Sequence, residues 1–235
     1  EVRHVVAHDD AVFVLVQDTV AVCIHAHRAG NRRALAERHR AKIDHIALRQ
    51  IHHAADFAIL RIGYTGYTKG ALRTDGSFTS HLRGARAAGI DVGVYYFSQA
   101  VTVQEAAAEA AHVLRLLDGH QLELPVYFDW EPVFADDSRT KGNDNGYLTE
   151  CAAAFCGVVE SAGYPAGIYL NRQQGYYRYD LSRLADYALW VADYNDYPDF
   201  YYAFDMWQYS DSAVLDGMPT QADLDLLFVP SPRSA

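Results

Sequence analysis

Short apolar segments alternate with amphipathic ones over most of this 235-residue chain, starting near residue 56. The apolar segments have the length and the β-branched and aromatic content of buried strands. We therefore expect six strands, over residues 57–64, 91–98, 125–131, 166–171, 188–194 and 205–210.

The segments between these strands favour helices, because they are rich in alanine and their apolar residues recur at helical spacing. The predicted helices are 77–88, 103–117 and 147–162, and each is followed by a glycine, as helix ends commonly are. Repeated β–α units of this kind predict an α/β fold with a parallel sheet, either open or closed into a barrel.

The first 50 residues have a different pattern. Val12–Val16 and Val20–Ile24 are apolar and flank a short polar segment, which favours a hairpin or two buried strands. Arg28–Lys42 is basic and contains alanine and leucine, so we expect an exposed helix there.

Composition and charge narrow the function classes. Half of the residues are hydrophobic, and no apolar run is long enough to span a membrane, so we expect no membrane insertion. Residues 51–235 carry 12 Lys and Arg against 24 Asp and Glu, which argues against nucleic-acid binding. Cys151 and Cys156 lie five residues apart on a predicted helix, where we expect buried apolar residues and no disulfide. The chain begins at Glu1 without a visible signal peptide, which suggests processing or excision from a longer protein.

Polar and aromatic side chains occur where the predicted strands end. Parallel sheets gather functional residues at the carboxyl ends of their strands, so we expect these side chains to converge on one pocket. They include Tyr64, Tyr96, Asp129, Glu131, Tyr169, Asp193 and Gln208.

The most informative strand end carries Asp129 and Glu131. Because side chains alternate along a strand, both acids and Tyr127 share one face, and the residues between them share the other. Two adjacent carboxylates repel each other, which raises the pKa of one of them. A protonated acid beside an ionised carboxylate is the arrangement that cleaves glycosidic bonds, although such a pair alone is also typical of a solvated strand end.

Motifs spread over about four fifths of the chain carry a family resemblance. They are Lys42–Asp44, Phe57–Tyr64, Asp75 with Phe78, Ala87–Ile90, Gly93–Ser98, Leu124–Glu131, Gly167–Tyr169, Leu189–Tyr194, Trp207–Ser210 and Asp223–Asp225. In this order they resemble the glycoside hydrolase family 25 lysozymes, the Chalaropsis-type N-acetylmuramidases. The resemblance implies a modified TIM-like (β/α) barrel as a single catalytic domain over residues 42–235, preceded by a segment of unclear role at 1–41.

The resemblance also implies a bacteriolytic peptidoglycan hydrolase that cleaves the β-1,4 bond between N-acetylmuramic acid and N-acetylglucosamine. Glu131 would be the general acid, Asp129 would stabilise charge or orient the substrate's acetamido group, and Asp223 would polarise the site. Asp223 also has a structural interpretation, as a salt-bridge or turn residue. The candidate sugar-binding residues are Tyr64, Tyr96, Tyr169, Trp190, Asp193, Trp207 and Gln208. Core packing is an equal alternative for Trp190.

One departure from the family pattern concerns its first strand, which carries a further aspartate. Counting back from Lys42 without a gap, Leu35 occupies that position. Either Val20–Ile24 supplies the first strand, or the start of the chain is foreign to the domain. The alternatives are therefore a catalytically impaired glycan-binding barrel and a chitinase-like glycosidase.

The remaining expectations follow from these points. His25 with His27, and His52 with His53, lack nearby ligands at convincing spacing, so we expect no metal site. We also expect no organic cofactor, peptidoglycan glycan strands as the partner, a monomer, and action outside the cell or in the cell wall.

Overall fold

The computed structural model describes residues 55–141, 146–214 and 221–230, together with the backbone of three N-terminal strands. Those three are β1 (Ala7–His8), β2 (Ala11–Val12) and β3 (Val20–Ala29). The other strands are β4 (Phe57–Thr65), β5 (Leu72–Thr74), β6 (Asp91–Ser98), β7 (Val126–Trp130), β8 (Ala166–Asn171), β9 (Ala188–Ala192), β10 (Met206–Ala213) and β11 (Ala222–Pro230). The helices are α2 (Phe78–Ala87), α3 (Val103–Leu117), α4 (Leu148–Ser161), α5 (Arg172–Tyr177) and the 3-10 turn η1 (Leu181–Arg183).

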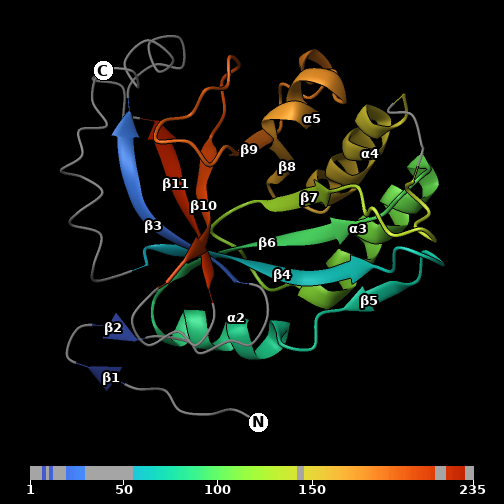
Figure 1. The fold of residues 1–235 in the computed structure, drawn as a ribbon. Helices are drawn as coiled ribbons and strands as arrows, with labels where there is room; N and C mark the ends of the chain where they lie inside the picture. The colour runs from blue at the N-terminus through green and yellow to red at the C-terminus, as the bar shows by residue number, and fades with distance from the viewer. Residues whose placement is uncertain are drawn as a thin grey trace.

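The main sheet curls into a barrel (Figure 1). Its order is β3-β11-β10-β9-β8-β7-β6-β4-β5, and β3 also pairs with β4, so eight strands close a ring with β5 at its outer edge. Neighbours from β4 through β6 to β10 are parallel, whereas β11 is antiparallel to β10 and β3 is antiparallel to β4. The fold is therefore the predicted modified (β/α) barrel and not a regular one with eight parallel strands.

Most predicted elements lie where the hydrophobic pattern put them. The bounds of β6, β8 and α3 agree with the prediction to the residue, and α2 and α4 are one residue shorter at each end. The strands β5 and β11 and the short helices α5 and η1 were not predicted. The elements β5, α5 and η1 are too short to show a long apolar run or helical periodicity. β11 does contain an apolar run, at 226–229, which the prediction did not use.

The N-terminal segment contributes to the barrel. The strand β3, Val20–Ala29, extends beyond the predicted strand 20–24. The first two residues of the predicted helix Arg28–Lys42 therefore belong to this strand. Its register is set by pairing Ala21 with Asp223 on one side and with Ile59 on the other. The remainder of the predicted helix to Lys42, together with Leu35, His52 and His53, lies outside the described residues.

The outer side of the sheet packs against α2, α3 and α4. From β7, Val126, Phe128 and Trp130 face this layer, which is the alternation that the sequence predicted. The ring of Phe128 lies 5.2 Å from that of Phe155 on α4. Cys151 and Cys156 are also buried in this cluster as free thiols, again as predicted.

The inner side of the barrel is filled by aromatic rings around Trp190. The rings of Tyr169, Tyr127 and Tyr95 meet Trp190 edge to face at 4.7, 5.2 and 6.2 Å. Gly167 permits this packing, because a Cβ there would lie 2.5 Å from the Tyr127 ring. The interior is thus a packed aromatic layer, as barrel interiors of this width are, and the polar residues sit above it.

Replacing Phe155 with alanine tests the outer core. Phe155 is fully buried against the Phe128 and Tyr96 rings, so the Phe155→Ala variant should lose about 3–5 kcal/mol of unfolding free energy. Urea denaturation followed by circular dichroism measures this loss.

Phe134→Ala is the matched control, because the Phe134 side chain is 85% exposed. Its unfolding free energy should change by less than about 0.5 kcal/mol. Equal effects of the two substitutions would contradict the assignment of Phe155 to the core.

Candidate active site

Asp129 lies where β7 reaches the rim of the barrel, between Phe97 of β6 and Tyr169 of β8 in the sheet register. Its side chain is only 6% exposed, and its Oδ1 atom has no hydrogen-bond partner among the described residues. A buried carboxylate oxygen without a partner is costly, and such atoms in folded proteins call for a functional explanation.

Three carboxyl groups influence one another at this rim. Burial, and then the charge of Glu131, raise the pKa of Asp129 well above the ordinary value. Burial and the charge of Asp223 likewise raise the pKa of Glu131. Burial and the nearby Asp211 raise the pKa of Asp223 to about 6. Because ionising neighbouring acids together is unfavourable, the Asp129–Glu131 pair retains a proton above the usual carboxyl range.

Strand direction explains why Asp223 joins the pair. β11 runs antiparallel to β10, so its first residues lie at the end of the barrel where the parallel strands finish. Asp225, two residues on, shares the inner face and accepts the Trp190 indole N–H at 2.7 Å. The antiparallel strand therefore brings its amino end, and Asp223 with it, to the rim.

Arg61 on β4 is the cation of this site, and the sequence analysis did not single it out. Its Nε donates to the Asp75 carboxylate at 2.7 Å, and its guanidinium lies 5.5 Å from the centre of the Tyr64 ring. Its positive charge lowers the pKa of Asp129, against burial and the two other acids. Arg61 therefore favours the ionised form of Asp129.

Tyrosines and a glutamine form a second polar group beside the acids. The hydroxyls of Tyr169 and Tyr194 both donate to Gln208 Oε1, at 2.9 and 2.8 Å. Burial raises the pKa of Tyr169, and the charges of Glu131 and Asp129 raise it further. The effect of the two acids on Tyr169, and its hydrogen bond to Gln208, show that these two predicted sugar-binding residues lie near the acids. Tyr194, which is half exposed, joins them as a residue that the sequence prediction omitted.

Three predicted sugar-stacking rings are buried elsewhere. Tyr96 faces the helices, fully buried, and its hydroxyl is hydrogen-bonded to Thr65. Trp207 is buried on the outer face with its indole N–H donated to the Asp193 carbonyl, and Trp190 is packed inside the barrel. We correct these three assignments to packing, because a ring enclosed by protein offers no face to a sugar. These residues were predicted to bind sugar because they lie near strand ends, without considering on which face of the sheet each side chain lies.

The other predicted residues differ in exposure. Tyr64, next to the last residue of β4, is 38% exposed, so its ring is available to a ligand. Asp193 is buried and accepts hydrogen bonds from the Asn195 side chain and from the Asp199 backbone N–H. These bonds give Asp193 a role in shaping the loop after β9 (Ala188–Ala192).

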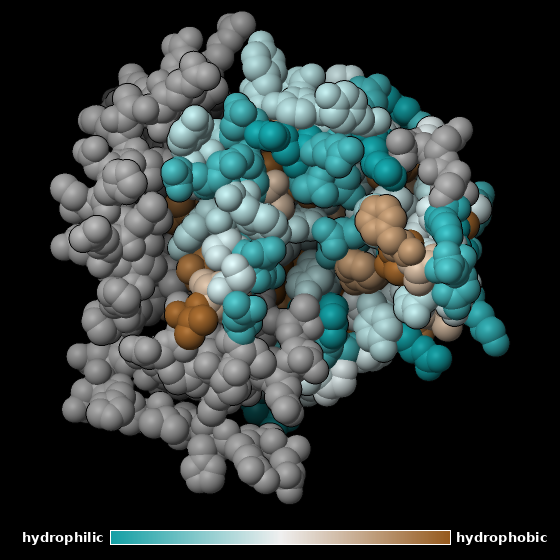
Figure 2. All heavy atoms as spheres, in the orientation of Figure 1, coloured by the Kyte–Doolittle hydropathy of each residue, from teal (hydrophilic) through white to brown (hydrophobic). Residues whose placement is uncertain are grey.

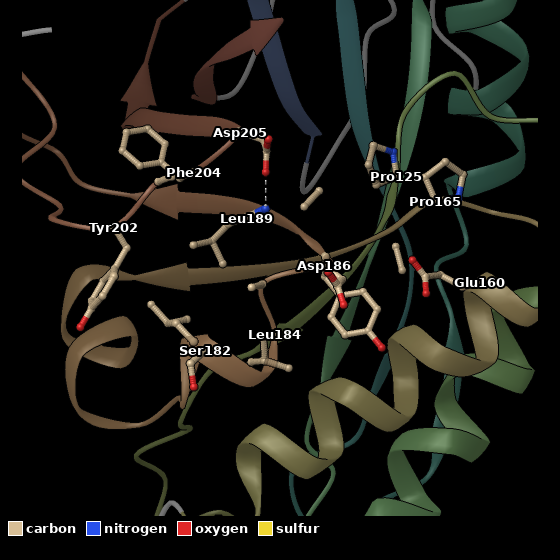
Figure 3. Close-up of a pocket in the computed structure, with 16 residues that line it drawn as sticks. Pro125, Glu160, Pro165, Ser182, Leu184, Asp186, Leu189, Tyr202, Phe204 and Asp205 are labelled. Atoms are coloured by element: carbon tan, nitrogen blue, oxygen red, sulfur yellow. Dashed lines mark hydrogen bonds between the residues drawn. The ribbon is translucent and has the colours of Figure 1, made fainter. Parts of the chain in front are cut away.

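A separate cavity lies at the opposite end of the barrel (Figure 3). It has a volume of about 630 Å³ and surrounds the amino ends of β7 to β10. Its lining includes Pro125, Leu189 and Asp205, and Asp205 accepts the Leu189 backbone N–H at 3.0 Å. None of the predicted site residues lines this cavity, so it is distinct from the acidic rim.

Three further observations concern the surface, metal binding and membrane spanning. Figure 2 shows hydrophilic side chains over most of the described surface on one face, with hydrophobic ones in small separate areas. Within residues 55–141, 146–214 and 221–230, no three His, Cys, Asp or Glu side chains are grouped to hold a metal ion. No helix in the described part of the chain is both long and apolar enough to cross a bilayer.

Comparison with known proteins identifies the family. The model of glycosyl hydrolases family 25 matches residues 57–218, which is more than half of the chain. The chain belongs to glycosyl hydrolase family 25. It is also 26% identical over 168 residues to the autolytic lysozyme of Clostridium acetobutylicum, covering 71% of this chain and 48% of that protein.

Several solved structures share this fold. The spore cortex lytic enzyme SleM of Clostridium perfringens superposes with a TM-score of 0.64 at 22% identity, covering 92% of this chain and 70% of that one. A family 25 glycosyl hydrolase from Bacillus anthracis gives 0.62 at 17% identity, covering 90% and 89%. The autolysin LytC of Streptococcus pneumoniae, solved with a synthetic peptidoglycan ligand, gives 0.62 at 19% identity, covering 93% and 50%. The family 25 chain spans about half the length of the autolytic lysozyme and of LytC.

Removing the positive charge of Arg61 tests the electrostatics of this family 25 site. In Arg61→Met the pKa of Asp129 should rise further, because the positive charge of Arg61, which lowers it, is gone. Carbon-13 NMR titration of labelled aspartate carboxyls, with Asp129→Asn as the assignment control, measures this shift.

Arg183→Met is the comparison variant, because Arg183 forms an exposed ion pair with Glu150 away from the rim. It should leave the Asp129 titration unchanged. A titration of Asp129 that is unaltered in Arg61→Met would show that Arg61 does not act on the acids.

Proposed function

We propose that this family 25 chain hydrolyses peptidoglycan as a muramidase, cleaving the β-1,4 bond between N-acetylmuramic acid and N-acetylglucosamine. The observation that carries the proposal is the group of three neighbouring carboxyls above an aromatic layer, with Asp129 buried and Glu131 and Asp223 half-buried. Glycosidic cleavage needs one acid that holds its proton near neutral pH and one carboxylate that stabilises positive charge.

Glu131 acts as the general acid. It follows the last residue of β7 and is less buried than Asp129, so it is the member of the pair that reaches a leaving-group oxygen. Burial and Asp223 raise its pKa, which keeps the proton available for transfer. As the glycosidic bond breaks, this proton moves to the departing sugar oxygen.

Asp129 acts as the ionised partner once substrate is bound. Burial alone favours the neutral acid, whereas Arg61 and a developing positive charge on the sugar ring favour the carboxylate. Its unpartnered Oδ1 is suited to accept the N–H of the substrate's 2-acetamido group. That hydrogen bond orients the acetamido oxygen for attack on the anomeric carbon, as in substrate-assisted hydrolases. Two acids from one strand end favour this route over attack from the opposite face of the sugar.

Sugar contacts come from exposed aromatic and polar groups near the acids. Tyr64 offers a ring face, and Tyr169 and Tyr194 present hydroxyls fixed by Gln208. Rings with hydroxyl tips suit pyranoses, which have apolar faces and polar edges. We infer that the glycan strand of the cell wall lies along this group, which implies action outside the cell or in the wall. A monomer suffices, since the site residues named here come from one chain.

A glycan-binding barrel without turnover is the second candidate. It is favoured by the sequence of β3, Val20–Ala29, which pairs with β11 beside Asp223 and contains no carboxylate. The family resemblance places a further aspartate on the first barrel strand, and this strand does not provide it. Binding to cell walls without release of reducing ends would identify this second function.

Glu131→Gln decides between the two. Loss of the proton donor should lower turnover of purified peptidoglycan by about 10²- to 10⁴-fold with little change in wall binding. Reducing-end release and wall turbidity measure turnover, and a pull-down with insoluble walls measures binding.

Glu160→Gln, on the exposed surface of α4, is the matched control and should retain full activity. New reducing ends should be N-acetylmuramic acid. N-acetylglucosamine at that position would instead identify a different glycosidase, such as a chitinase-like enzyme. An active Glu131→Gln variant would rule out Glu131 as the acid.

Asp223→Asn tests the coupling through pH dependence. Asp223 is ionised above a pKa of about 6, and its charge raises the pKa of Glu131. Without that charge Glu131 should lose its proton at a lower pH, so the alkaline fall in kcat/KM should move to lower pH. The measurement is a kcat/KM profile between pH 4 and 9.

Asp186→Asn provides the comparison, because Asp186 lines the cavity at the opposite end of the barrel. Its profile should coincide with that of the unmodified protein. A shift of the alkaline fall to higher pH in Asp223→Asn would contradict the proposed coupling.

A further inference from the structure

Glu109 is a buried carboxyl group that the proposed chemistry does not use. It projects from α3 toward the sheet, is 1% exposed, and pairs with no cation among the described residues. Its Oε1 accepts from the Thr65 hydroxyl at 2.6 Å and from the Gln99 backbone N–H at 3.4 Å. Its Oε2 accepts from the Ser98 hydroxyl at 2.6 Å. A buried acid held only by neutral donors is destabilising, so its presence calls for a reason.

Two of the three bonds, from Ser98 and from the Gln99 N–H, hold the turn at the end of β6, and the third ties Glu109 to Thr65 at the end of β4. Ser98 Oγ donates to Glu109 and accepts the Ala100 backbone N–H at 3.1 Å. Gln99, between them, is fully buried. Glu109 therefore fixes both the backbone of this turn and the direction in which the Gln99 side chain leaves it.

The Gln99 side chain reaches the strand end that carries the acid. Its Nε2 donates to the backbone carbonyl of Glu131 at 2.7 Å and to that of Ser98 at 2.8 Å. Its Oε1 accepts from the Thr140 hydroxyl at 3.2 Å, which leaves the carboxamide little freedom to rotate.

Other bonds hold the same strand end. Gln174 Nε2 donates to the Trp130 carbonyl at 2.7 Å, and the Trp130 indole N–H donates to the Ala100 carbonyl at 3.0 Å. The carbonyls of two successive residues, Trp130 and Glu131, are thus each bound by a buried glutamine amide. Outside regular sheet pairing, this is how the backbone of the acid is oriented.

We propose that Gln99 and Glu109 are positioning residues for Glu131: Glu109 fixes the turn after β6, and the Gln99 carboxamide holds the backbone of Glu131 so that its carboxyl is presented at the rim. The proposal deepens the proposed function, on which it rests for the role of Glu131 as the acid. Small displacements of a catalytic group are enough to cost large factors in rate.

Because Glu109 is ionisable, its effect on the turn after β6 should depend on pH. Burial raises the pKa of Glu109 to about 7, against the lowering effect of its three hydrogen bonds. Only the ionised form accepts all three bonds, so the turn is held most firmly above that pH.

Several titratable or charged groups lie around Glu109. They are Tyr96 of β6, Glu105 and His112 of α3, Cys151 of α4, and Arg139, which is paired with Glu105. Burial raises the pKa of Tyr96 and raises that of Cys151 to about 12, so both stay neutral between pH 5 and 9. Burial lowers the pKa of His112, which keeps that ring neutral as the pH rises through 7.

Two substitutions test the proposal by kinetics on purified peptidoglycan. Gln99→Met keeps the side-chain length without the amide and should lower kcat about 10- to 100-fold with little change in KM. Glu109→Gln should lower kcat about 10-fold at pH 8 and much less at pH 5, where Glu109 is itself protonated. Thr149→Val, which removes the part-buried hydrogen bond that the Thr149 hydroxyl accepts from the Asp180 N–H away from the rim, should leave kcat unchanged.

Stability separates positioning from a purely structural role. A pKa raised from 4.5 to about 7 means that the contribution of Glu109 to folding is lost as pH rises through that window. The Tm of Glu109→Gln relative to the unmodified protein should therefore rise from pH 5 to pH 8, while its relative kcat falls. A kcat ratio that stays constant with pH, or a kcat that falls only where the Tm falls, would overturn the proposal.

An inactive unmodified protein would refute the proposed function, and the positioning of Glu131 then needs a measurement that does not depend on turnover. Carbon-13 NMR of labelled glutamate, assigned with Glu131→Gln, reports the pKa of Glu131 directly. In Gln99→Met the freed side chain gains solvent, so its pKa should fall toward the ordinary value. An unchanged Glu131 pKa in Gln99→Met would show that Gln99 does not position the acid.

Discussion

The burial of carboxyl groups above a filled barrel is the constraint on which the rest of this structure depends. Trp190 and the three tyrosine rings around it close the interior, so water does not reach the lower side of Asp129. A carboxylate in such surroundings is expensive to ionise, and a second acid nearby makes it more so. The high pKa values that general-acid chemistry requires therefore follow from packing before any substrate is considered. Arg61, anchored by Asp75, offsets part of this cost and does so on the Asp129 side.

The same cost explains the polar support around the strand end. An acid that must keep its proton has to sit at a boundary between protein and solvent, where backbone is not held by sheet pairing alone. Here two buried glutamines bind successive carbonyls, at Trp130 and at Glu131. The buried Glu109 behind them destabilises the fold above its pKa of about 7, yet it fixes the turn from which Gln99 departs. Stability is thus traded for geometry at a distance from the reacting atoms, as is common around functional sites.

The observed barrel agrees with membership of glycosyl hydrolase family 25. The amino-terminal part of the chain, however, lacks the acidic first-strand motif that the family resemblance implies. β3 closes the ring by pairing with both β11 and β4, so the sheet is complete. Its ten residues contain no acid, whereas its neighbour β11 contributes Asp223. Closure of a barrel needs only backbone pairing and apolar inner residues. Completeness of the fold and completeness of the catalytic set are therefore separate properties in this chain.

The sequence alone determined the parallel βα units and the rim acids, because apolar periodicity and side-chain alternation are local properties of the chain. Side-chain alternation alone put Val126, Phe128 and Trp130 on one face of the strand and Asp129 on the other, and the structure shows that the first face meets the helices. Tyr96 and Trp207 were misassigned, because nearness to a strand end does not say which face a ring occupies. Only the tertiary structure showed that Gln99 bonds the Glu131 backbone, that Glu109 bonds Gln99, and that Arg61 lies near enough to act on Asp129. Gln99 reaches the Glu131 carbonyl across 32 residues of sequence, and Arg61 acts on Asp129 across 68 (129 − 61). No local pattern encodes such pairings.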